Sequence, residues 1–154
     1  MSTSEVLAFD CGKTIVGILD VDHNVYTPYR YRKEMIEGAK RIAMSAGTIV
    51  SFNGNGWDLD EIAKILSLPS KQELSLRCQH DDMAEIISMI RWPPHPGSAP
   101  ICGQSLDDTY RYYFAGEAIT PPAHVLDSYE VNNWGDCYMP AELWKKWKRG
   151  DLGP

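Results

Sequence analysis

The spacing of strand-length segments near the start of the chain restricts the possible folds more than any other feature. Val6–Asp10, Ile15–Asp20 and, less regularly, Asn24–Tyr31 are rich in apolar, aromatic or β-branched residues. The gaps Cys11–Thr14 and Val21–His23 that separate them are too short for a crossover helix. We therefore expect these three segments to pair as antiparallel neighbours.

Helix and strand patterns alternate along the rest of the chain. Helical spacing of apolar residues predicts a helix over Lys33–Ser45, and β-branched residues predict a strand at Thr48–Phe52. Leu74–His80 is a weaker strand candidate. Further helices are expected after Asp58 or Asp60, from Asp81 or Asp82 to Ile90, over Leu106–Phe114, and from about Asp136 to Lys148. This order predicts an α/β fold whose mixed five-stranded sheet, with three antiparallel strands and two parallel ones, is flanked by helices.

Length and composition indicate one globular domain over residues 1–154. Apolar residues make up 44% of the chain, close to the globular average. The apolar runs are strand-length, far short of the roughly 18 residues that a membrane helix needs, and no signal peptide is visible. The four cysteines show neither paired metal spacing nor a dense disulfide pattern. Reduced thiols, and hence a cytoplasmic protein without membrane contact, are the expectation.

The formal charge of −6 is unlike the basic surface expected of a general nucleic-acid coat. It is compatible with an enzyme that gathers carboxylates around metal ions. Asp10 ends the first predicted strand, and Asn53 to Asp58 follow the fourth. Sites in open sheets form beyond the carboxyl ends of strands, so these residues fall where a site is expected. The simpler alternatives are a turn role for Asp10, helix caps at Asp58 and Asp136, and loop stabilisation by Asn53.

Several segments together resemble small stand-alone 3′–5′ exonucleases of the DEDD type, related to the proofreading domains of family B DNA polymerases. Asn53-Gly54-Asn55-Gly56-Trp57-Asp58 is similar to the family's second motif, with tryptophan in place of phenylalanine. His80-Asp81-Asp82-Met83 and Ser105-Leu106-Asp107 resemble later motifs, and Asp136, Leu143 and Gly150 resemble the closing one. The likeness extends over nearly the whole chain, although each motif is short.

The resemblance implies a ribonuclease H-like fold and a metal-dependent 3′–5′ exonuclease acting on nucleic acid, with single-stranded 3′ ends favoured. Asp10, Asp58 and Asp136 would be the catalytic metal ligands for Mg²⁺ or Mn²⁺, as two ions or one. The resemblance also implies contacts with the nucleic-acid substrate. Asn53 and Tyr129 would lie beside the bound nucleic acid, and Trp57 or Trp134 would stack on a terminal base.

Two departures from the family pattern matter. The first motif is Asp-x-Glu, but here Gly12 stands where glutamate is expected. The last motif carries a tyrosine or a histidine just before its aspartate, where this chain has Asn132 and Val131. Tyr129 or His124 could replace that group by swinging in from a loop. The alternative is a catalytically degenerate domain that binds nucleic acid or protein.

A second resemblance competes with the first. Phe9-Asp10-Cys11-Gly12-Lys13-Thr14, followed by Val16-Gly17-Ile18, is similar to the opening of RuvC-type junction resolvases, in which Gly12 would be natural. Such a structure-selective endonuclease needs a glutamate at the end of the fourth strand, where this chain has Phe52-Asn53. Both resemblances imply the same fold and phosphodiester chemistry.

Basic residues gather at two places. Lys145, Lys146, Lys148 and Arg149 alternate with tryptophans on the last helix, and Arg30, Arg32 and Lys33 lie among Tyr29 and Tyr31. Each group is either an ordinary solvated face or a strip that contacts phosphates, and the sequence leaves both interpretations open.

Overall fold

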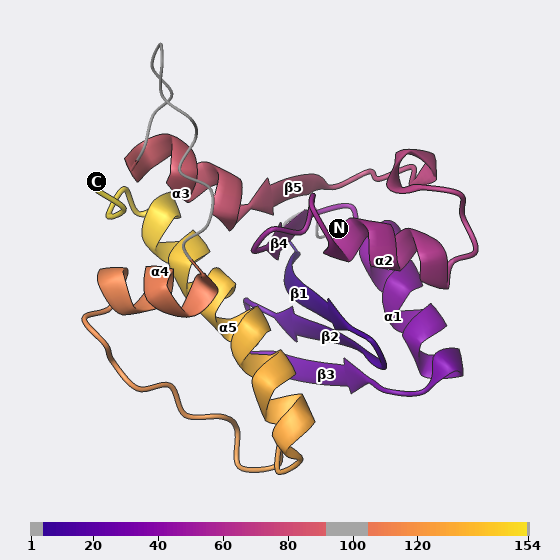
Figure 1. Ribbon diagram of the computed structural model, residues 1–154, viewed down its shortest axis with the longest axis horizontal. Helices are drawn as coiled ribbons and strands as arrows, with labels where there is room; N and C mark the ends of the chain where they lie inside the picture. Colours follow the sequence, from indigo (N-terminus) through magenta and orange to yellow (C-terminus); the bar gives the residue numbers. More distant parts are fainter. Residues whose placement is uncertain (1–4, 92–104, 154) are drawn as a thin grey trace.

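The computed structural model describes residues 5–91 and 105–153 (Figure 1). Cys102, one of the four predicted thiols, lies outside these ranges. One sheet with the strand order β3-β2-β1-β4-β5 forms the centre of the molecule. Its strands are β1 (Val6–Gly12), β2 (Ile15–Asp20), β3 (Val25–Tyr29), β4 (Thr48–Ser51) and β5 (Gln79–Asp82). β3, β2 and β1 pair antiparallel, whereas β1, β4 and β5 pair parallel. The predicted α/β fold with a mixed five-stranded, ribonuclease H-like sheet is confirmed.

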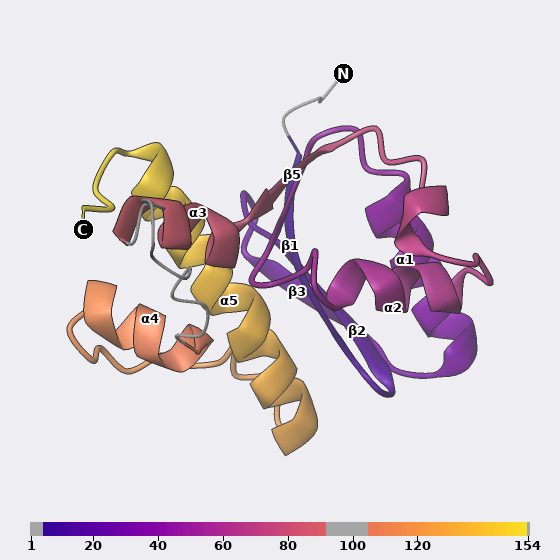
Figure 2. The ribbon, with the colours of Figure 1, turned by 45° about the horizontal axis from the view of Figure 1, so that its top comes forward.

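Helices cover both faces of the sheet (Figure 2). On one side lie α1 (Arg32–Ala43) and α2 (Asp58–Ile65), and on the other lie α3 (Met83–Arg91), α4 (Leu106–Tyr113) and α5 (Ser128–Lys148). A short 3-10 turn, η1 (Lys71–Glu73), precedes β5. No helix in the described ranges is both long enough and apolar enough to span a bilayer.

Alternation along β1 decides which residues face which layer. Successive side chains of a strand point to opposite faces. Leu7 and Phe9 therefore pack in the core under α1 and α2, whereas Val6 and Ala8 pack in the core under α5. Asp10 continues the second series. The strand thus directs this carboxylate toward α5.

Two elements depart most from the bounds expected from the sequence. Helix α5 begins at Ser128 rather than near Asp136, with Asp127 as the cap that accepts from the N–H groups of Tyr129 and Glu130. The asparagine-rich and glycine-containing first half of α5 has low helix propensity, and packing on the sheet overrides it. The fifth strand covers Gln79–Asp82 rather than Leu74–His80.

Candidate functional site

Asp10 lies at an open part of the sheet. β1 continues to Gly12 instead of ending at Asp10, but its parallel pairing with β4 stops at Ala8 and Val50. Across the antiparallel ladder Asp10 faces Gly17, which has no side chain. Space is therefore left above Gly17 for groups from α5 to reach the Asp10 carboxylate.

Asp58 is brought to the same place by α2. It is the first residue of the helix and not its cap, because Trp57 occupies the cap position. The Asp58 side chain is only 2% exposed, and its Oδ1 accepts a hydrogen bond from the backbone N–H of Cys11 at 3.2 Å. The simple capping alternative for Asp58 is therefore wrong, and its carboxylate instead ties the start of α2 to β1.

Asp136 approaches from the other helical layer. It lies inside α5 and is partly buried, so the alternative that it caps the last helix is also wrong. Burial, followed by the nearby charge of Asp107, raises the pKa of Asp136 to about 6.

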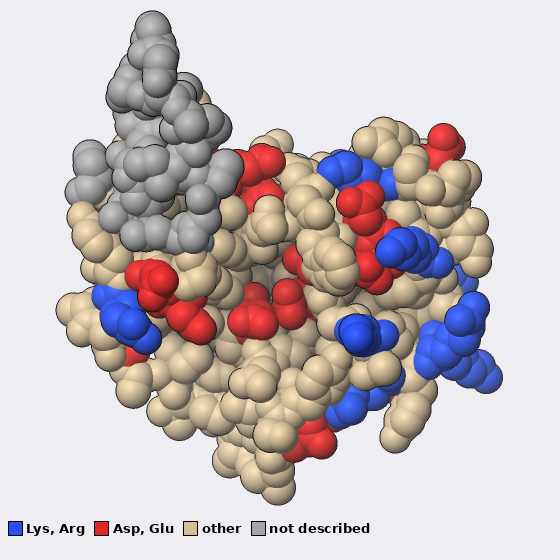
Figure 3. Space-filling view, viewed as in Figure 1, with Lys and Arg blue, Asp and Glu red and all other residues tan. Residues whose placement is uncertain are grey.

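The three carboxylates interact with one another, and we call Asp10, Asp58 and Asp136 the acidic centre. Burial, and then the charges of Asp58 and Asp136, raise the pKa of Asp10 to about 8. Burial raises the pKa of Asp58 to about 7, with contributions from Asp82 and Asp136 and an opposing effect of the Cys11 N–H. Figure 3 shows acidic side chains gathered in the hollow at the middle of this face. Segments far apart in the sequence thus supply acidic groups to one space.

Asn133 is a site residue that the sequence analysis missed. It is 4% exposed, and its Nδ2 donates to the backbone carbonyl oxygen of Asp10 at 3.1 Å and to Asp10 Oδ2 at 3.2 Å. Its Oδ1 accepts from the Tyr26 hydroxyl at 2.5 Å. Asn133 therefore fixes the orientation of the Asp10 carboxylate. The last helix was expected to begin near Asp136, so no local signal marked Asn133 as a buried helical amide.

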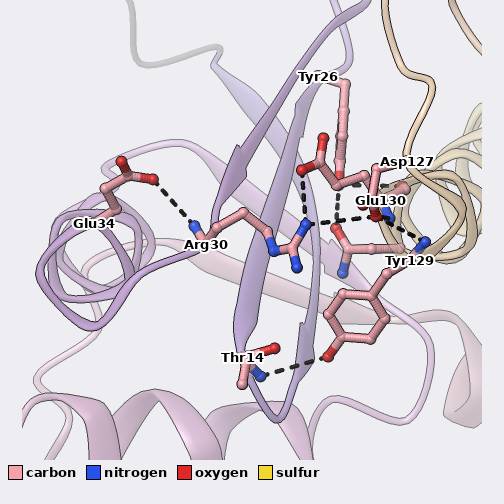
Figure 4. Close-up of polar contacts among 8 residues, drawn as sticks. Thr14, Tyr26, Arg30, Glu34, Asp127, Tyr129 and Glu130 are labelled. Atoms are coloured by element: carbon pink, nitrogen blue, oxygen red, sulfur yellow. Dashed lines mark hydrogen bonds and ion pairs between the residues drawn. The ribbon is translucent and has the colours of Figure 1, made fainter.

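Tyr129 occupies the space that a side chain at position 12 would need. A Cβ atom added to Gly12 would lie 2.6 Å from the Tyr129 hydroxyl, which also accepts from the Thr14 N–H at 3.4 Å (Figure 4). Tyr129 belongs to α5 and not to a loop, so the expectation that it swings in from a loop is wrong. Asn132 and His124 are both exposed. Tyr129 therefore places a phenolic oxygen beside the first motif without any movement.

Asp82 shapes the loop between β4 and α2. This aspartate is 3% exposed and accepts from the backbone N–H groups of Asn53 at 2.7 Å and Asn55 at 3.1 Å. It also accepts from the Ala84 N–H at the start of α3, as predicted for a cap. Asn53 is itself exposed and has a φ of 67°, a left-handed conformation that asparagine tolerates. Asn53 is thus available at the surface beside the acidic centre.

The two candidate tryptophans behave differently. Trp57 is 53% exposed and precedes Asp58 directly. Trp134 is 2% exposed and stacks on Tyr138 with ring centroids 4.8 Å apart. The predicted base-stacking role does not fit Trp134, because its ring is already covered by the core.

The histidine and aspartate at the end of β5 have structural partners. His80 Nε2 lies 2.8 Å from the hydroxyl oxygen of Ser51. Asp81 Oδ2 accepts from the indole N–H of Trp144 at 2.9 Å. These contacts agree with the interpretation of this segment as a strand end followed by a cap.

The basic strip on α5 is largely structural. Trp144 and Trp147 pack against the core on this side of the sheet, and the Lys148 ammonium lies 5.2 Å from the centre of the Trp147 ring. Lys145 pairs with Glu142 at 2.9 Å. The solvated-face interpretation therefore fits this helix better than a strip of free phosphate contacts.

The fit to a divalent ion rests on the donors and their charge. In the described parts of the chain, no ion pair involves the acidic centre, and no three His, Cys, Asp or Glu side chains form a ready ligand set. Mg²⁺, however, keeps several waters and is held by one or two carboxylates together with substrate phosphates. Two hard carboxylates that lack a cationic partner suit such an ion.

Neither the protein-family models nor the curated proteins contain a match to this sequence.

Proposed function

We propose that this protein is a metal-dependent phosphodiester hydrolase of the 3′–5′ exonuclease kind, acting on single-stranded ends of nucleic acid. The observation that carries the proposal is the convergence of Asp10, Asp58 and Asp136 from β1, α2 and α5. Proteins tolerate mutually repelling, largely buried carboxylates at a cost in stability, and such clusters are enriched at functional sites.

Asp10 and Asp58 are the residues that would hold Mg²⁺ or Mn²⁺, with Asp136 beside them. A bound ion would activate a water molecule and neutralise charge on the phosphate. The chain's own contribution is positioning. Asn133 holds the Asp10 carboxylate, and the Cys11 N–H holds that of Asp58.

Exposed groups around the centre suit a nucleic-acid end. Trp57, next to Asp58, presents an aromatic face on which a terminal base can stack. Asn53 offers an amide at the rim, and the Tyr129 hydroxyl offers a donor next to Gly12. These three residues are the proposed substrate contacts.

A catalytically degenerate nucleic-acid-binding domain is the second candidate. The close approach of Tyr129 to Gly12 favours it, because that contact occupies the space in which the family's glutamate would sit. The absence of a ready three-ligand set among the described residues points the same way. A resolvase-like endonuclease lacks comparable support, since no carboxylate follows β4 at Phe52-Asn53.

The test is cleavage of end-labelled oligonucleotides, single-stranded, double-stranded and branched, in Mg²⁺ or Mn²⁺. We expect stepwise shortening of single strands from the 3′ end. Asp58→Asn should reduce the rate about 100-fold or more, because the asparagine carries no charge to hold the ion. Asp60→Asn, two residues further along the same helix, is the matched control and should cleave like the wild type.

Oligonucleotide binding without cleavage in any metal would replace the hydrolase with the degenerate candidate. Cleavage confined to branched DNA would favour the resolvase-like activity instead. Equal cleavage by the Asp58→Asn and Asp60→Asn variants would show that the acidic centre is not the catalytic site.

A further inference from the structure

A cavity of about 550 Å³ lies between the tip of the β1–β2 hairpin, the start of α1 and the end of α2. Its basic lining residues are Lys13, Arg30, Arg32 and Lys64, and none of its lining residues is acidic. Figure 3 shows Lys and Arg side chains next to the central acidic hollow, over the hairpin and the start of α1. In a chain of net charge −6, this is a local concentration of positive charge.

The four cations are not equally available. Arg30 pairs with Glu130 at 2.8 Å, with its guanidinium 5.0 Å from the centre of the Tyr129 ring, and Lys64 pairs with Glu61 at 3.3 Å. Lys13 and Arg32 are exposed and take part in no ion pair within the described ranges. Two charges that face an open cavity without a counter-ion suit an anionic ligand.

The rest of the wall is apolar or aromatic. Met35, Ile36 and Ile65 line the cavity together with Tyr31, whose side chain is 75% exposed. A small inorganic anion uses cations only and gains nothing from such a wall. A nucleotide unit uses both kinds of surface, because its phosphate is charged and its base has an apolar face that stacks on aromatic rings.

The cavity lies within a short reach of the acidic centre. Asp58 begins α2 and Lys64 lies six residues further along it, so the two are about 9 Å apart along the helix axis. Lys13 follows Asp10 by three residues of extended chain, again about 10 Å at most. A strand whose end enters the acidic centre therefore carries its next phosphates within reach of the cavity.

Tyr129 connects the two places. Its hydroxyl lies against Gly12 on the side of the acidic centre and accepts from the N–H of Thr14, which lines the cavity. Its ring supports Arg30, another lining residue (Figure 4). Tyr129 therefore contacts β1 at Gly12 and two of the residues that line the cavity, Thr14 and Arg30.

We propose that this basic cavity binds a nucleotide unit of the single strand whose 3′ end lies at the acidic centre, with Lys13 and Arg32 contacting its phosphates. The inference rests on the proposed function. It adds the place at which the protein binds the uncleaved part of the nucleic-acid strand. In this proposal, the basic residues at the β1–β2 hairpin tip and at the start of α1 make the main electrostatic contribution to substrate affinity.

The test measures binding separately from cleavage. A fluorescent single-stranded oligonucleotide of about 12 nucleotides is titrated with protein in EDTA, and its anisotropy is followed at several salt concentrations. Lys13→Gln combined with Arg32→Gln should weaken binding about tenfold or more. The salt slope should also fall by about 1.4, because each phosphate contact on a single strand contributes about 0.7. The matched control, Lys40→Gln with Arg149→Gln, removes the same charge from exposed positions outside the cavity and should bind within about twofold of the wild type.

The outcomes separate this inference from the hydrolase. If the wild type cleaves but the cavity variant binds like the control variant, the cavity proposal is overturned and the hydrolase stands. If the wild type binds and the cavity variant does not, the cavity proposal is supported whether or not cleavage occurs. A mononucleotide that competes as well as the oligonucleotide would overturn strand binding in favour of a free-nucleotide site, and failure of the wild type to bind would overturn the proposal outright.

Discussion

The Asp10 carboxyl group shows most directly how the acidic centre lowers the stability of the folded protein. It is largely removed from water, two other carboxylates are near, and its main compensation is the Asn133 amide, which lowers its pKa. Because the unfavourable effects dominate, the pKa of Asp10 is raised to about 8. Without a cation, the folded protein therefore holds a proton here that the unfolded chain gives up at about pH 4.

This difference predicts how stability depends on pH in the metal-free protein. Between about pH 4 and pH 8 the folded state binds more protons than the unfolded state, so the free energy of unfolding falls as the pH rises. Asp10→Asn keeps an acceptor for Asn133 but removes the charge. We expect this variant to be more stable than the wild type near pH 8 by about 1–3 kcal/mol, and to differ little near pH 5.

Urea unfolding in EDTA at the two pH values measures this difference. Asp22→Asn, an exposed aspartate in the β2–β3 turn, is the control and should follow the wild type at both pH values. An Asp10→Asn variant that is less stable than the wild type near pH 8 would contradict this account of the site.

At the scale of elements, the site depends on how closely β2 and α5 approach. Gly17 lies opposite Asp10, and a Cβ atom there would overlap the Asn133 side-chain amide. A different rotamer of Asn133 would cost free energy, since the side chain is buried and hydrogen-bonded to both Asp10 and Tyr26. A single methyl group on β2 therefore acts directly on the orientation of the Asp10 carboxylate.

Gly17→Ala should consequently destabilise the protein by about 2–4 kcal/mol and reduce hydrolysis in the fraction that folds. Gly135→Ala is the contrasting variant. A Cβ atom on Gly135 meets only Ile119, at an ordinary 3.5 Å, and alanine favours the helix by about 1 kcal/mol. Chemical denaturation of both variants measures the difference, and equal stabilities would disprove the close-packing argument.

The length of α5 also shows why element boundaries were hard to predict. Asp136 was expected to begin the helix, whereas Ser128 does. The additional first two turns of α5 carry Tyr129 and Asn133, the two residues that contact Gly12 and Asp10. Local propensity disfavours a helix there, and only the sheet beneath stabilises it.

At the scale of the whole molecule, repulsion within the acidic centre should couple folding to divalent ions. An ion that binds the folded state alone stabilises it by an amount that grows with ligand concentration, about 2.7 kcal/mol at one hundred times Kd. For a chain of 154 residues this corresponds to a rise in Tm of roughly 5–10 °C. The rise should be larger near pH 8 than near pH 6, because protons compete with the ion for the same carboxylates.

Thermal unfolding with millimolar Mg²⁺ or Mn²⁺, against the same protein in EDTA, tests this coupling. The variant that combines Asp10→Asn with Asp58→Asn should lose the metal-dependent rise. An equal rise in wild type and variant would place the bound ion elsewhere and exclude the acidic centre as the metal site.

The sequence by itself determined the order of strands and helices, the antiparallel start of the sheet, and Asp10, Asp58 and Asp136 as the candidate residues. The order of elements and the antiparallel start of the sheet follow from local patterns, since side-chain periodicity and short gaps leave few other arrangements. The three aspartates were singled out together by the resemblance to the exonuclease motifs. Only the tertiary structure decided that Asn133 holds Asp10, that Tyr129 fills the space at Gly12, and that Trp134 belongs to the core. The contacts of Asn133 with Asp10 and of Tyr129 with Gly12 join residues more than one hundred positions apart. Such contacts depend on how closely the sheet and α5 pack, and a local sequence pattern does not predict that distance.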